Sequence, residues 1–452
     1  MDELRATMLD ALGTAFAVAP YVVVLVLALV TCIVSLMVWR SPVAGLVVVL
    51  VSIGAETLFP GFGLPIGVKV IVPDLASMIL LLPVFFRLTS LWRNGAAHRL
   101  WIVFGAVMAG SMLYGAMAYG TKAGIEVRVH LHYWIVGTYF MTFPWRDAQA
   151  LRMVKVFIAG AFVMVLLALY RWLGLAFGFG DVLDWNDAGN SLRVFNYNTT
   201  IGIGLALTLA IFGRGVGAGA GVGLLILPLA ATVIVLQHRT AWAAVAVALA
   251  VAALSSGKLR DLQAKGMRRG LAGLVVVAVV IIALGQGDKL GDSLDHSVEE
   301  VGSERSTLSW RTQSWQELMK GWVHAGPRVW LVGSPYGAGF NRWIENWNRE
   351  ADVNPHSNYV YLILRVGIVG SAALLGSILL ALRALARRRD DGWAVLLGAG
   401  LIMQLVGFFA YPSYYGIAFV VGMALSYLGR AGEGQGSRVA ASEHSGAASW
   451  TT

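Results

Sequence analysis

Residues 16–39 read FAVAPYVVVLVLALVTCIVSLMVW, a run of 24 residues without a charged side chain. A helix of about 20 apolar residues crosses the hydrocarbon core of a bilayer, so this run is long enough to span a membrane. Similar runs recur along nearly the whole chain of 452 residues, of which 58% are hydrophobic and 13% charged. Soluble domains are about 45–50% apolar and about 25% charged. The sequence therefore predicts an all-α polytopic membrane protein.

Thirteen apolar segments are candidate membrane spans. They cover residues 16–39, 43–59, 68–88, 100–119, 125–143, 153–178, 200–213, 219–236, 240–256, 270–285, 356–382, 392–410 and 413–429. We expect about 12–13 transmembrane helices and one large extracytoplasmic loop that carries short helices. No cleavable signal peptide is expected, because residues 1–15 are net acidic and the first apolar run is long enough to span.

Basic side chains are concentrated in every second loop. One alternating set of loops, which includes 87–99, 257–269 and 383–391, carries 19 Lys and Arg residues. The short loops of the other set carry 5, namely Arg5, Lys69, Lys122, Arg193 and Arg239. The positive-inside rule places the basic set in the cytoplasm and the N-terminus outside. Most of the net charge of +9 then reflects topology, and no nucleic-acid partner is expected.

The chain divides into four regions. Residues 1–285 hold about ten spans, 286–355 form the extracytoplasmic (periplasmic) loop, 356–430 return to the membrane, and 431–452 form a Gly/Ser/Ala-rich tail. The composition of this last region predicts a disordered cytoplasmic tail.

One segment of the large loop has helical periodicity. Apolar side chains recur at helical spacing at Trp315, Leu318, Met319 and Trp322, beside polar residues at Arg311, Gln316 and Lys320. This pattern predicts an amphipathic helix. Such a helix either lies on the membrane surface or packs on a small core of the loop itself.

Charged and titratable side chains near the membrane are costly there and hence informative. Almost all lie on the outer side in this topology, at Arg128, His130, His132, Arg171, Arg193, His238, Arg239, His356 and Arg365. A cluster of arginines at one membrane face suits an anionic ligand such as a diphosphate, because the planar guanidinium binds phosphate oxygens in pairs. For Arg171 or Arg365 alone, a snorkelling side chain is an equally good interpretation.

Four segments form an ordered set of motifs. Residues 193–198 read RVFNYN, residues 237–242 read QHRTAW, Trp310-Arg311 and Trp315 precede the glycine-rich stretch 333–340, and residues 356–370 read HSNYVYLILRVGIVG. The set resembles, in the same order, the motifs of O-antigen ligases and related Wzy-type polysaccharide polymerases. The chain departs from that pattern at Thr240, where a glycine is usual, and at Tyr197, where a proline is usual. The glycine-rich stretch favours a tight turn over a phosphate cradle, because no strand–helix pattern surrounds it.

The resemblance implies an inner-membrane glycosyltransferase that needs no metal and no cofactor. Its donor would be a glycan on undecaprenyl diphosphate, and its acceptor would be lipid A-core or another lipid-linked glycan. The single cysteine, Cys32, independently excludes an internal disulfide and a cysteine-based metal cluster.

The chemistry of such a transfer assigns roles to individual residues. The diphosphate needs fixed cations, for which Arg193 and Arg239 are the candidates and Arg128 is a weaker third. His356, together with Arg239, would be catalytic, with the imidazole as general base in the first turn of the span that follows Pro355. The acceptor glycan would contact the large loop, at Arg311, Trp315 and Tyr336.

The alternative function is a non-enzymatic transporter, or flippase, for lipid-linked oligosaccharides. It predicts internal repeats and polar residues through the whole depth of the bilayer. The sequence contains no convincing repeat, and its polar residues gather on one side. The choice between ligase and polymerase, the glycan and the oligomeric state stay open at this point.

Overall fold

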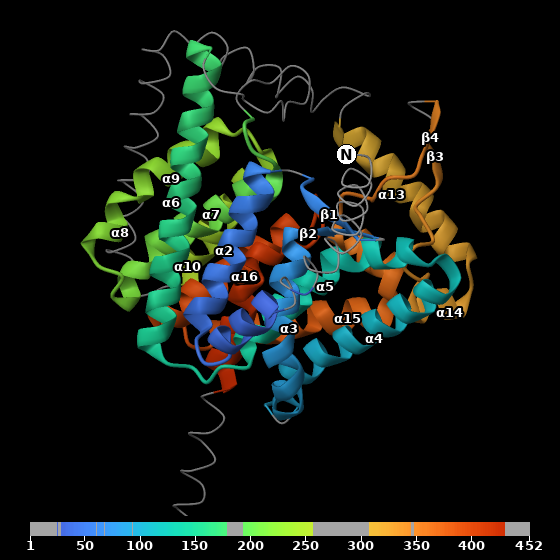
Figure 1. Ribbon diagram of the computed structural model, residues 1–452, viewed down its shortest axis with the longest axis horizontal. Coiled ribbons are helices and arrows are strands. Elements are labelled where there is room, and N and C mark those ends of the chain that lie inside the picture. Colours follow the sequence, from blue (N-terminus) through green and yellow to red (C-terminus); the bar gives the residue numbers. More distant parts are fainter. Residues whose placement is uncertain are drawn as a thin grey trace, which may run out of the picture.

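The computed structural model describes residues 25, 29–59, 61–66, 68–92, 94–178, 193–255, 307–344 and 348–429. These residues fold almost entirely into helices (Figure 1), which confirms the predicted all-α class. The helices are α2 (Pro42–Leu58), α3 (Val72–Leu91), α4 (Ala96–Tyr119), α5 (Thr121–Met141), α6 (Asp147–Phe177), α7 (Tyr197–Phe212), α8 (Ala220–Leu224), α9 (Ile226–Val235), α10 (Arg239–Ser255), α13 (Thr307–His324), α14 (Pro327–Val332), α15 (Asn358–Ala386) and α16 (Gly392–Gly407).

Two short antiparallel hairpins complete the described structure. Strand β1 (Gly63–Ile66) pairs with β2 (Val68–Ile71), and β3 (Arg342–Ile344) pairs with β4 (Arg349–Ala351). In Figure 1, α13, α14 and the β3–β4 hairpin lie together at one side of the helical body. The amphipathic helix predicted around Trp315 is present as α13, and its buried Ser314 and Leu318 point toward the protein.

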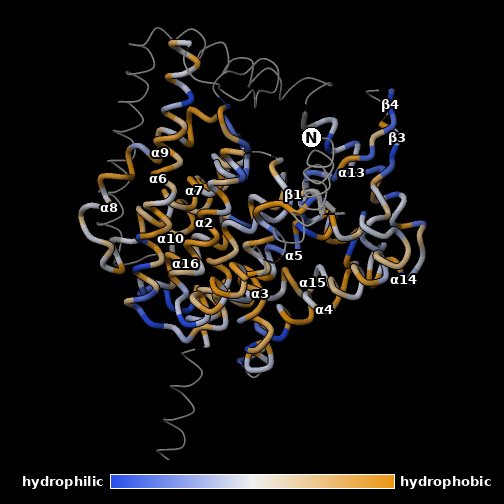
Figure 2. The backbone as a smooth tube through the Cα atoms, viewed as in Figure 1, coloured by the Kyte–Doolittle hydropathy of each residue, from blue (hydrophilic) through white to orange (hydrophobic). Residues whose placement is uncertain are grey.

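Among the residues that the structure describes, four helices are long and apolar enough to cross a membrane by length and composition, namely α3, α4, α6 and α15. Shorter apolar helices occupy the other predicted spans that fall on described residues, including α2, α7, α10, α16, and the segments Leu29–Val38 and Tyr415–Gly429. Figure 2 shows hydrophobic residues along these helices and hydrophilic ones on α13, β3 and β4. The chain is thus a multi-pass membrane protein. The predicted span 270–285 and the tail 431–452 lie outside the described residues.

Loops that the charge pattern assigns to the same side also meet in space. At one end of the molecule, the ring of Trp145 lies 5.1 Å from the rings of Trp393 and Tyr427, and Tyr427 donates a 2.6 Å hydrogen bond to Asp391. The 31-residue helix α6 begins beside this cluster, at Asp147. These contacts gather the loops before α6 and α16 at one end.

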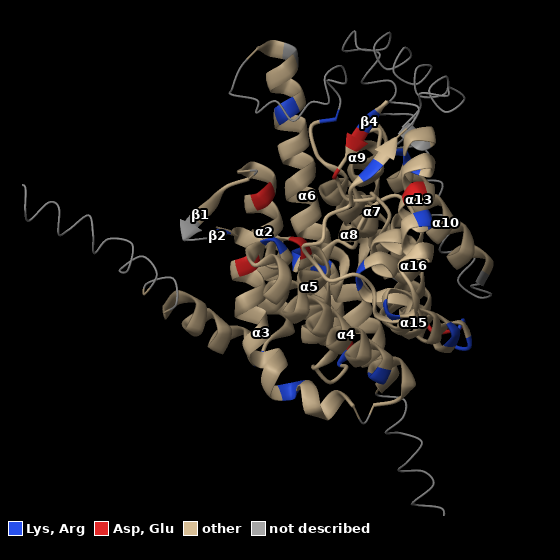
Figure 3. Ribbon diagram, turned by 90° about the vertical axis from the view of Figure 1, so that its right-hand side faces the viewer, with Lys and Arg blue, Asp and Glu red and all other residues tan. Residues whose placement is uncertain are grey.

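The opposite end of α6 holds the second set of loops. Arg171, near that end, donates hydrogen bonds to the carbonyl oxygens of Val194 (2.7 Å) and Thr57 (2.8 Å). The guanidinium also lies 5.1 Å above the ring of Phe195. Figure 3 shows most acidic residues in the upper half of the molecule and mainly Lys and Arg at its lower end.

Helix α15 is kinked where the large loop packs against it. Gly367 has a positive φ of 62° inside the helix, and a Cβ atom there would lie 2.3 Å from the carbonyl oxygen of Leu331. The backbone N–H of Ser334 donates to the carbonyl of Leu364 at 2.7 Å. Only a residue without a side chain allows the end of α14 to approach this closely, so Gly367 lets the loop dock into the kink.

Candidate functional site

A tight turn between α9 and α10 positions Arg239. Gln237 adopts a left-handed conformation with φ of 54°, which reverses the chain, and Arg239 is the first residue of α10. The indole N–H of Trp242 donates to the carbonyl of Val233 at 2.8 Å and fastens the two helices together. Positive φ is uncommon outside glycine, and such strain often occurs at functional sites.

The segment before α7 lies against this turn. Arg193 donates a hydrogen bond of 3.3 Å to the carbonyl oxygen of Gln237, two residues before Arg239. A ring nitrogen of His238 lies 3.0 Å from the carbonyl oxygen of Phe195. Two segments more than 40 residues apart therefore bring the predicted arginines, Arg193 and Arg239, to the same turn.

A stack of tyrosines connects the turn to the large loop. The rings of Tyr197 and Tyr411 lie parallel, with centroids 3.5 Å apart. The guanidinium of Arg311, on α13, lies 5.1 Å from the centroid of the Tyr411 ring. The buried Nε of Arg311 has no hydrogen-bond partner among the described residues. Arg311 is therefore held on an aromatic surface and keeps a donor for another group.

His356 lies next to the same part of the loop, but its local structure differs from the prediction. Helix α15 begins at Asn358 with Ser357 as its N-cap, so His356 precedes the helix and is not in its first turn. Its φ is 51°, and its backbone N–H donates to the side chain of Asn354 at 2.9 Å. The side-chain oxygen of Asn354 caps this turn, which explains why the helix starts later than Pro355 suggests.

The imidazole of His356 is surrounded by cations and by an aromatic ring. Its ring centroid lies 5.9 Å from that of Trp310. Burial, together with the charges of Arg311 and Arg342, lowers the pKa of His356 from 6.5 to about 4. The imidazole is therefore neutral at pH 7 and able to accept a proton. The physical cause is burial beside two guanidinium groups, and not a helix N-terminus.

The β3–β4 hairpin holds Arg342 in place under His356. The Arg342 guanidinium donates to the hydroxyl of Ser314 (2.6 Å) and to the carbonyl oxygens of Phe340 (2.7 Å) and Val353 (2.8 Å). It lies 5.8 Å from the ring centroid of Trp310. Burial lowers the pKa of Arg342, and the charge of Asp352 opposes that shift. Arg342 therefore links α13, the hairpin and the loop before His356.

The glycine-rich stretch of the loop is a turn that docks on the membrane helices. The carboxylate of Glu126, on α5, accepts a 2.7 Å hydrogen bond from the backbone N–H of Gly337 and forms an ion pair with Arg365. Arg365 also donates to the carbonyl oxygen of Gly339 at 2.5 Å. This arrangement agrees with the predicted turn. Arg365 is also paired with Glu126, whereas the snorkelling interpretation assumed an arginine without a partner.

Tyr336 in this stretch requires a correction. Its side chain is fully buried, with 0% exposed, and its hydroxyl lies 3.0 Å from the Nδ1 atom of His130. The other ring nitrogen of His130 lies 3.0 Å from the side-chain oxygen of Asn358, the first residue of α15. A ring enclosed in this way offers no exposed face to a sugar. The described contacts therefore give Tyr336 a role in fixing the loop and do not support the predicted contact with a glycan.

The other predicted glycan residue, Trp315, lies beside the site. Its indole N–H donates a 2.5 Å hydrogen bond to the carbonyl oxygen of Pro355, and its ring packs edge-on against Phe409 at 5.4 Å. Trp315 is partly exposed. It therefore fastens α13 directly to the residue that precedes His356.

Arg128 lies in a different contact network from the other arginines. It forms an ion pair of 2.9 Å with Asp74, on α3, and donates to the carbonyl oxygen of Lys69. A ring nitrogen of His132 lies 3.0 Å from the other oxygen of the same carboxylate. The structure thus brings Arg193, Arg239, Arg311 and His356 into one connected cluster, whereas the described contacts of Arg128 are with Asp74 and Lys69.

An apolar cavity of about 560 Å³ opens beside Arg239. Besides Arg239, its wall includes Thr240 and Ala243 of α10, Tyr359 of α15, and Phe409 after α16. The hydroxyl of Tyr359 donates to the carbonyl oxygen of Leu405 at 2.6 Å, which ties α15 to α16. Arg239 therefore lies at the edge of a space lined by membrane helices.

Sequence reasoning missed Tyr411, Arg342 and Glu126. A signal for Tyr411 exists, because residues 411–415 read YPSYY and interrupt an apolar region with three tyrosines and a proline. No comparable signal marks Glu126, whose partners lie more than 200 residues away in the chain. Arg342 is one of several loop arginines, and only its burial distinguishes it.

Comparison with known proteins adds one finding. Residues 223–375 match the family model described as O-antigen ligase. The matched segment includes Arg239, Arg311 and His356, and it confirms the resemblance drawn from the motifs. No curated protein and no solved structure shows a significant match to the chain.

Proposed function

From the premise that the chain belongs, through residues 223–375, to the O-antigen ligase family, we propose that it transfers a glycan from undecaprenyl diphosphate to a sugar hydroxyl. The family itself indicates a glycosyltransferase-type enzyme of polysaccharide assembly, with a lipid-linked glycan and an acceptor as substrates. The observation that carries the finer proposal is the convergence of Arg193, Arg239, Arg311 and His356. These residues come from four separate segments and lie at one end of the membrane helices.

The arginines are the proposed diphosphate site. Arg193 and Arg239 lie at one turn, and Arg311 adds a third guanidinium whose Nε has no partner among the described residues. Arginine stabilises the charge that develops on a departing phosphate without any metal ion, so the proposed chemistry is metal-independent. Arg311 was predicted to bind the acceptor glycan. Its position beside Tyr411 and His356 supports a role toward the diphosphate as well.

His356 is the proposed general base. The acceptor oxygen bonds to the anomeric carbon of the donor while the bond from that carbon to the diphosphate oxygen breaks. The hydroxyl proton passes to His356, and the electron pair stays with the diphosphate. A neutral imidazole can accept this proton. Diphosphate bound at Arg311 would offset the charge that lowers the pKa of His356, so donor binding raises that pKa toward the working pH.

The cavity beside Arg239 is the proposed place for the prenyl chain of the donor. Its wall consists mostly of hydrocarbon from α10, α15 and α16, and one edge carries the guanidinium. A lipid diphosphate needs both surfaces, an apolar one for the chain and a cationic one for the head group. The charge distribution supports an active site on the periplasmic face of the inner membrane.

Turnover by the purified protein tests the proposal. Purified protein with a glycan on undecaprenyl diphosphate and an acceptor should release undecaprenyl diphosphate and extend the acceptor. A flippase would move the lipid across a vesicle membrane without releasing it, and that outcome would replace the transferase proposal. Deletion in the host then separates two subtypes, because loss of a polymerase leaves single-repeat products and loss of a ligase leaves full-length chains on the carrier.

A further inference from the structure

An apolar pocket of about 270 Å³ opens between the ends of α10, α15 and α16. Its walls come from the last turns of α10 and α15 and from the first half of α16, with Val251 and Gly398 among the residues that form them. Two arginines, Arg383 and Arg389, also line the pocket, whereas no acidic residue does. The pocket thus combines hydrocarbon walls with two guanidinium groups.

The pocket lies near one boundary of the membrane. From Gly367, where the large loop docks, to its end at Ala386, α15 has 20 residues. A helix of this length rises about 30 Å, which is the thickness of the hydrocarbon core of a bilayer. The large loop is extracytoplasmic in the topology that the loop charges predict, so Arg383 and Arg389 lie at the cytoplasmic boundary.

The two arginines of the pocket are free to bind an anion. Among the described residues, neither Arg383 nor Arg389 forms an ion pair or a side-chain hydrogen bond, and both residues are exposed. The carboxylate of Asp391 does not line the pocket, and it accepts hydrogen bonds from the backbone N–H of Trp393 at 2.8 Å and from the hydroxyl of Tyr427 at 2.6 Å. Asp390 is exposed and does not line the pocket either.

The apolar walls continue into the lipid-facing surface of the same helices. Leu379 lies one turn before Arg383 on the same face of α15, and its side chain is 54% exposed. Leu254, near the end of α10, is 85% exposed. Apolar side chains on the outer surface of membrane helices contact lipid. A lipid can therefore reach the pocket from the bilayer, with its head group at the level of the arginines.

The size and charge of the pocket indicate which lipid fits. Its volume is below the roughly 300–1,000 Å³ of sites that enclose a whole small molecule, so the pocket suits part of an acyl chain. Arginine binds phosphate oxygens in pairs, and basic pockets between helices on the cytoplasmic side suit anionic head groups. The ammonium group of a zwitterionic lipid would be repelled by the same arginines.

We propose that Arg383 and Arg389 bind the phosphate of an anionic phospholipid, and that one acyl chain of this lipid enters the pocket between α10, α15 and α16. The site lies at the membrane boundary opposite the candidate active site and does not depend on the proposed transferase function. The other ends of the same three helices form the cavity beside Arg239. A lipid bound between these helices would therefore stabilise the packing that shapes that cavity.

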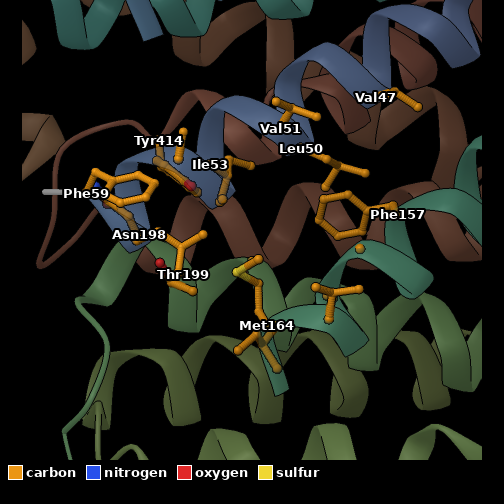
Figure 4. A pocket seen from close by; sticks show the side chains of 18 residues that line it. Val47, Leu50, Val51, Ile53, Phe59, Phe157, Met164, Asn198, Thr199 and Tyr414 are labelled. Carbon is orange, nitrogen blue, oxygen red and sulfur yellow. The ribbon is translucent and has the colours of Figure 1, made fainter. Parts of the chain in front are cut away.

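A larger apolar pocket offers a comparison. It has a volume of about 460 Å³ and lies between α2, α6 and α7 (Figure 4). Its lining includes no charged side chain, and Arg171, near its polar end, donates to the carbonyl oxygens of Val194 and Thr57. Gly202 in this pocket matches Gly398 in the other, because each is a half-buried helical glycine with no heavy atom within 4 Å of its Cβ position.

Removing the two charges tests the contact with the head group. In detergent, the unmodified protein should bind phosphatidylglycerol at least about tenfold more tightly than phosphatidylcholine. Arg383→Gln/Arg389→Gln should lose this preference. The control Arg387→Gln/Arg99→Gln removes the same charge from exposed residues that do not line the pocket, and it should keep the preference. A role of the arginines in topology or at the helix dipole alone predicts no such preference.

Filling the pocket tests the contact with the acyl chain. Gly398→Leu should weaken the binding of phosphatidylglycerol about tenfold or more, whereas Gly202→Leu should leave it unchanged. Unfolding temperatures without added lipid show which variants are folded. Glycerol phosphate, which has the head group without the chains, should bind the unmodified protein at least about tenfold more weakly than the lipid does. This second measurement tests the same contact if Gly398→Leu does not fold.

Three results would overturn the inference. Equal affinity of the unmodified protein for the two phospholipids would mean that the arginines do not select a head group, as would phosphatidylglycerol binding that Arg383→Gln/Arg389→Gln leaves unchanged. Equal affinity for inorganic phosphate and for phosphatidylglycerol would indicate a phosphate site without a chain. Tighter binding of undecaprenyl phosphate at the same site would assign the pocket to a prenyl chain instead.

Discussion

Glu126, on α5, and Arg365, on α15, form a buried ion pair, and the same carboxylate accepts a hydrogen bond from the backbone N–H of Gly337. Their side chains are 14% and 3% exposed, respectively. The carboxylate of Glu126 thus holds the large loop on helix α5. The same carboxylate neutralises the charge of Arg365, which donates a hydrogen bond to the carbonyl oxygen of Gly339. The loop and the start of α15, which together surround His356, are fixed by this pair.

We expect Glu126→Gln to destabilise the protein strongly. The amide can still accept a hydrogen bond from Gly337, but the charge of Arg365 remains buried without its counterion. Breaking a buried pair from one side costs about 3–5 kcal/mol. Thermal unfolding in detergent should show the loss, and the double variant Glu126→Gln/Arg365→Met should recover part of it. Glu317→Gln, which breaks the exposed pair with Lys320, is the control and should change stability by less than about 1 kcal/mol.

Gly367→Ala should prevent the loop from docking normally on α15. The position has a φ of 62°, and the added Cβ atom would lie 2.3 Å from the carbonyl oxygen of Leu331. We expect a loss of at least about 1–3 kcal/mol, because backbone must move on both sides. Gly124→Ala on α5 is the control, since its Cβ would meet no heavy atom within 4 Å. Equal unfolding temperatures for the two variants would contradict the importance of the kink.

Arg239→Ala should abolish or severely reduce transfer while the protein is still produced and folded. Arg239→Lys should restore only part of the rate, because lysine offers a point charge where arginine offers a planar fork. Arg193→Ala should likewise lower the rate of transfer more than Arg193→Lys does. Release of undecaprenyl diphosphate is the readout. If Arg239→Ala and Arg239→Lys both kept full activity, Arg239 would have no role at the diphosphate.

His356→Gly separates a catalytic from a structural role for the histidine. Glycine adopts a φ of 51° more readily than histidine does, which offsets part of the loss of packing between the imidazole and Trp310, so the variant should still fold. Transfer should nevertheless fall by about 10²–10⁴-fold, which is the usual contribution of a general base. His356→Gln should lose activity similarly, whereas donor binding should survive in both variants. A His356→Gln protein with nearly normal turnover would end the catalytic assignment.

The low pKa of His356 predicts the pH dependence of the reaction. The pH dependence of kcat/KM reports the pKa values of the free enzyme. We therefore expect kcat/KM to stay level from pH 7 downward and to fall only as the pH approaches the His356 pKa of about 4. The profile of kcat should fall at a higher pH, because bound diphosphate raises this pKa. A kcat/KM profile that falls near pH 6.5 would mean that the base is an unperturbed histidine or another group.

The same shift has a consequence for stability. The pKa is lower in the folded protein than the value of 6.5 expected for the unfolded chain, so the unfolded chain binds the proton first as the pH falls. This histidine therefore destabilises the fold progressively from about pH 6.5 to about pH 4. His356→Gln should lose that part of the pH dependence of unfolding.

The sequence by itself determined the class of fold and supplied several of the candidate site residues. Hydrophobic runs and the charge of the loops are local properties, because a membrane helix must satisfy its backbone within one segment. The order of the four motifs likewise indicated the O-antigen ligase family. In the structure Arg193 bonds to the turn that carries Arg239, and His356 lies near Arg311.

Only the tertiary structure decided how these residues are used. The left-handed turn at His356, the enclosure of Tyr336 and the pairing of Glu126 with Arg365 depend on contacts between residues far apart in the chain. The apolar pocket lined by residues of α2, α6 and α7 depends on how these three helices pack together. Periodicity and composition specify which face of a helix is apolar, but they do not specify its neighbour. Partners, burial and empty space therefore appear only when the helices are packed.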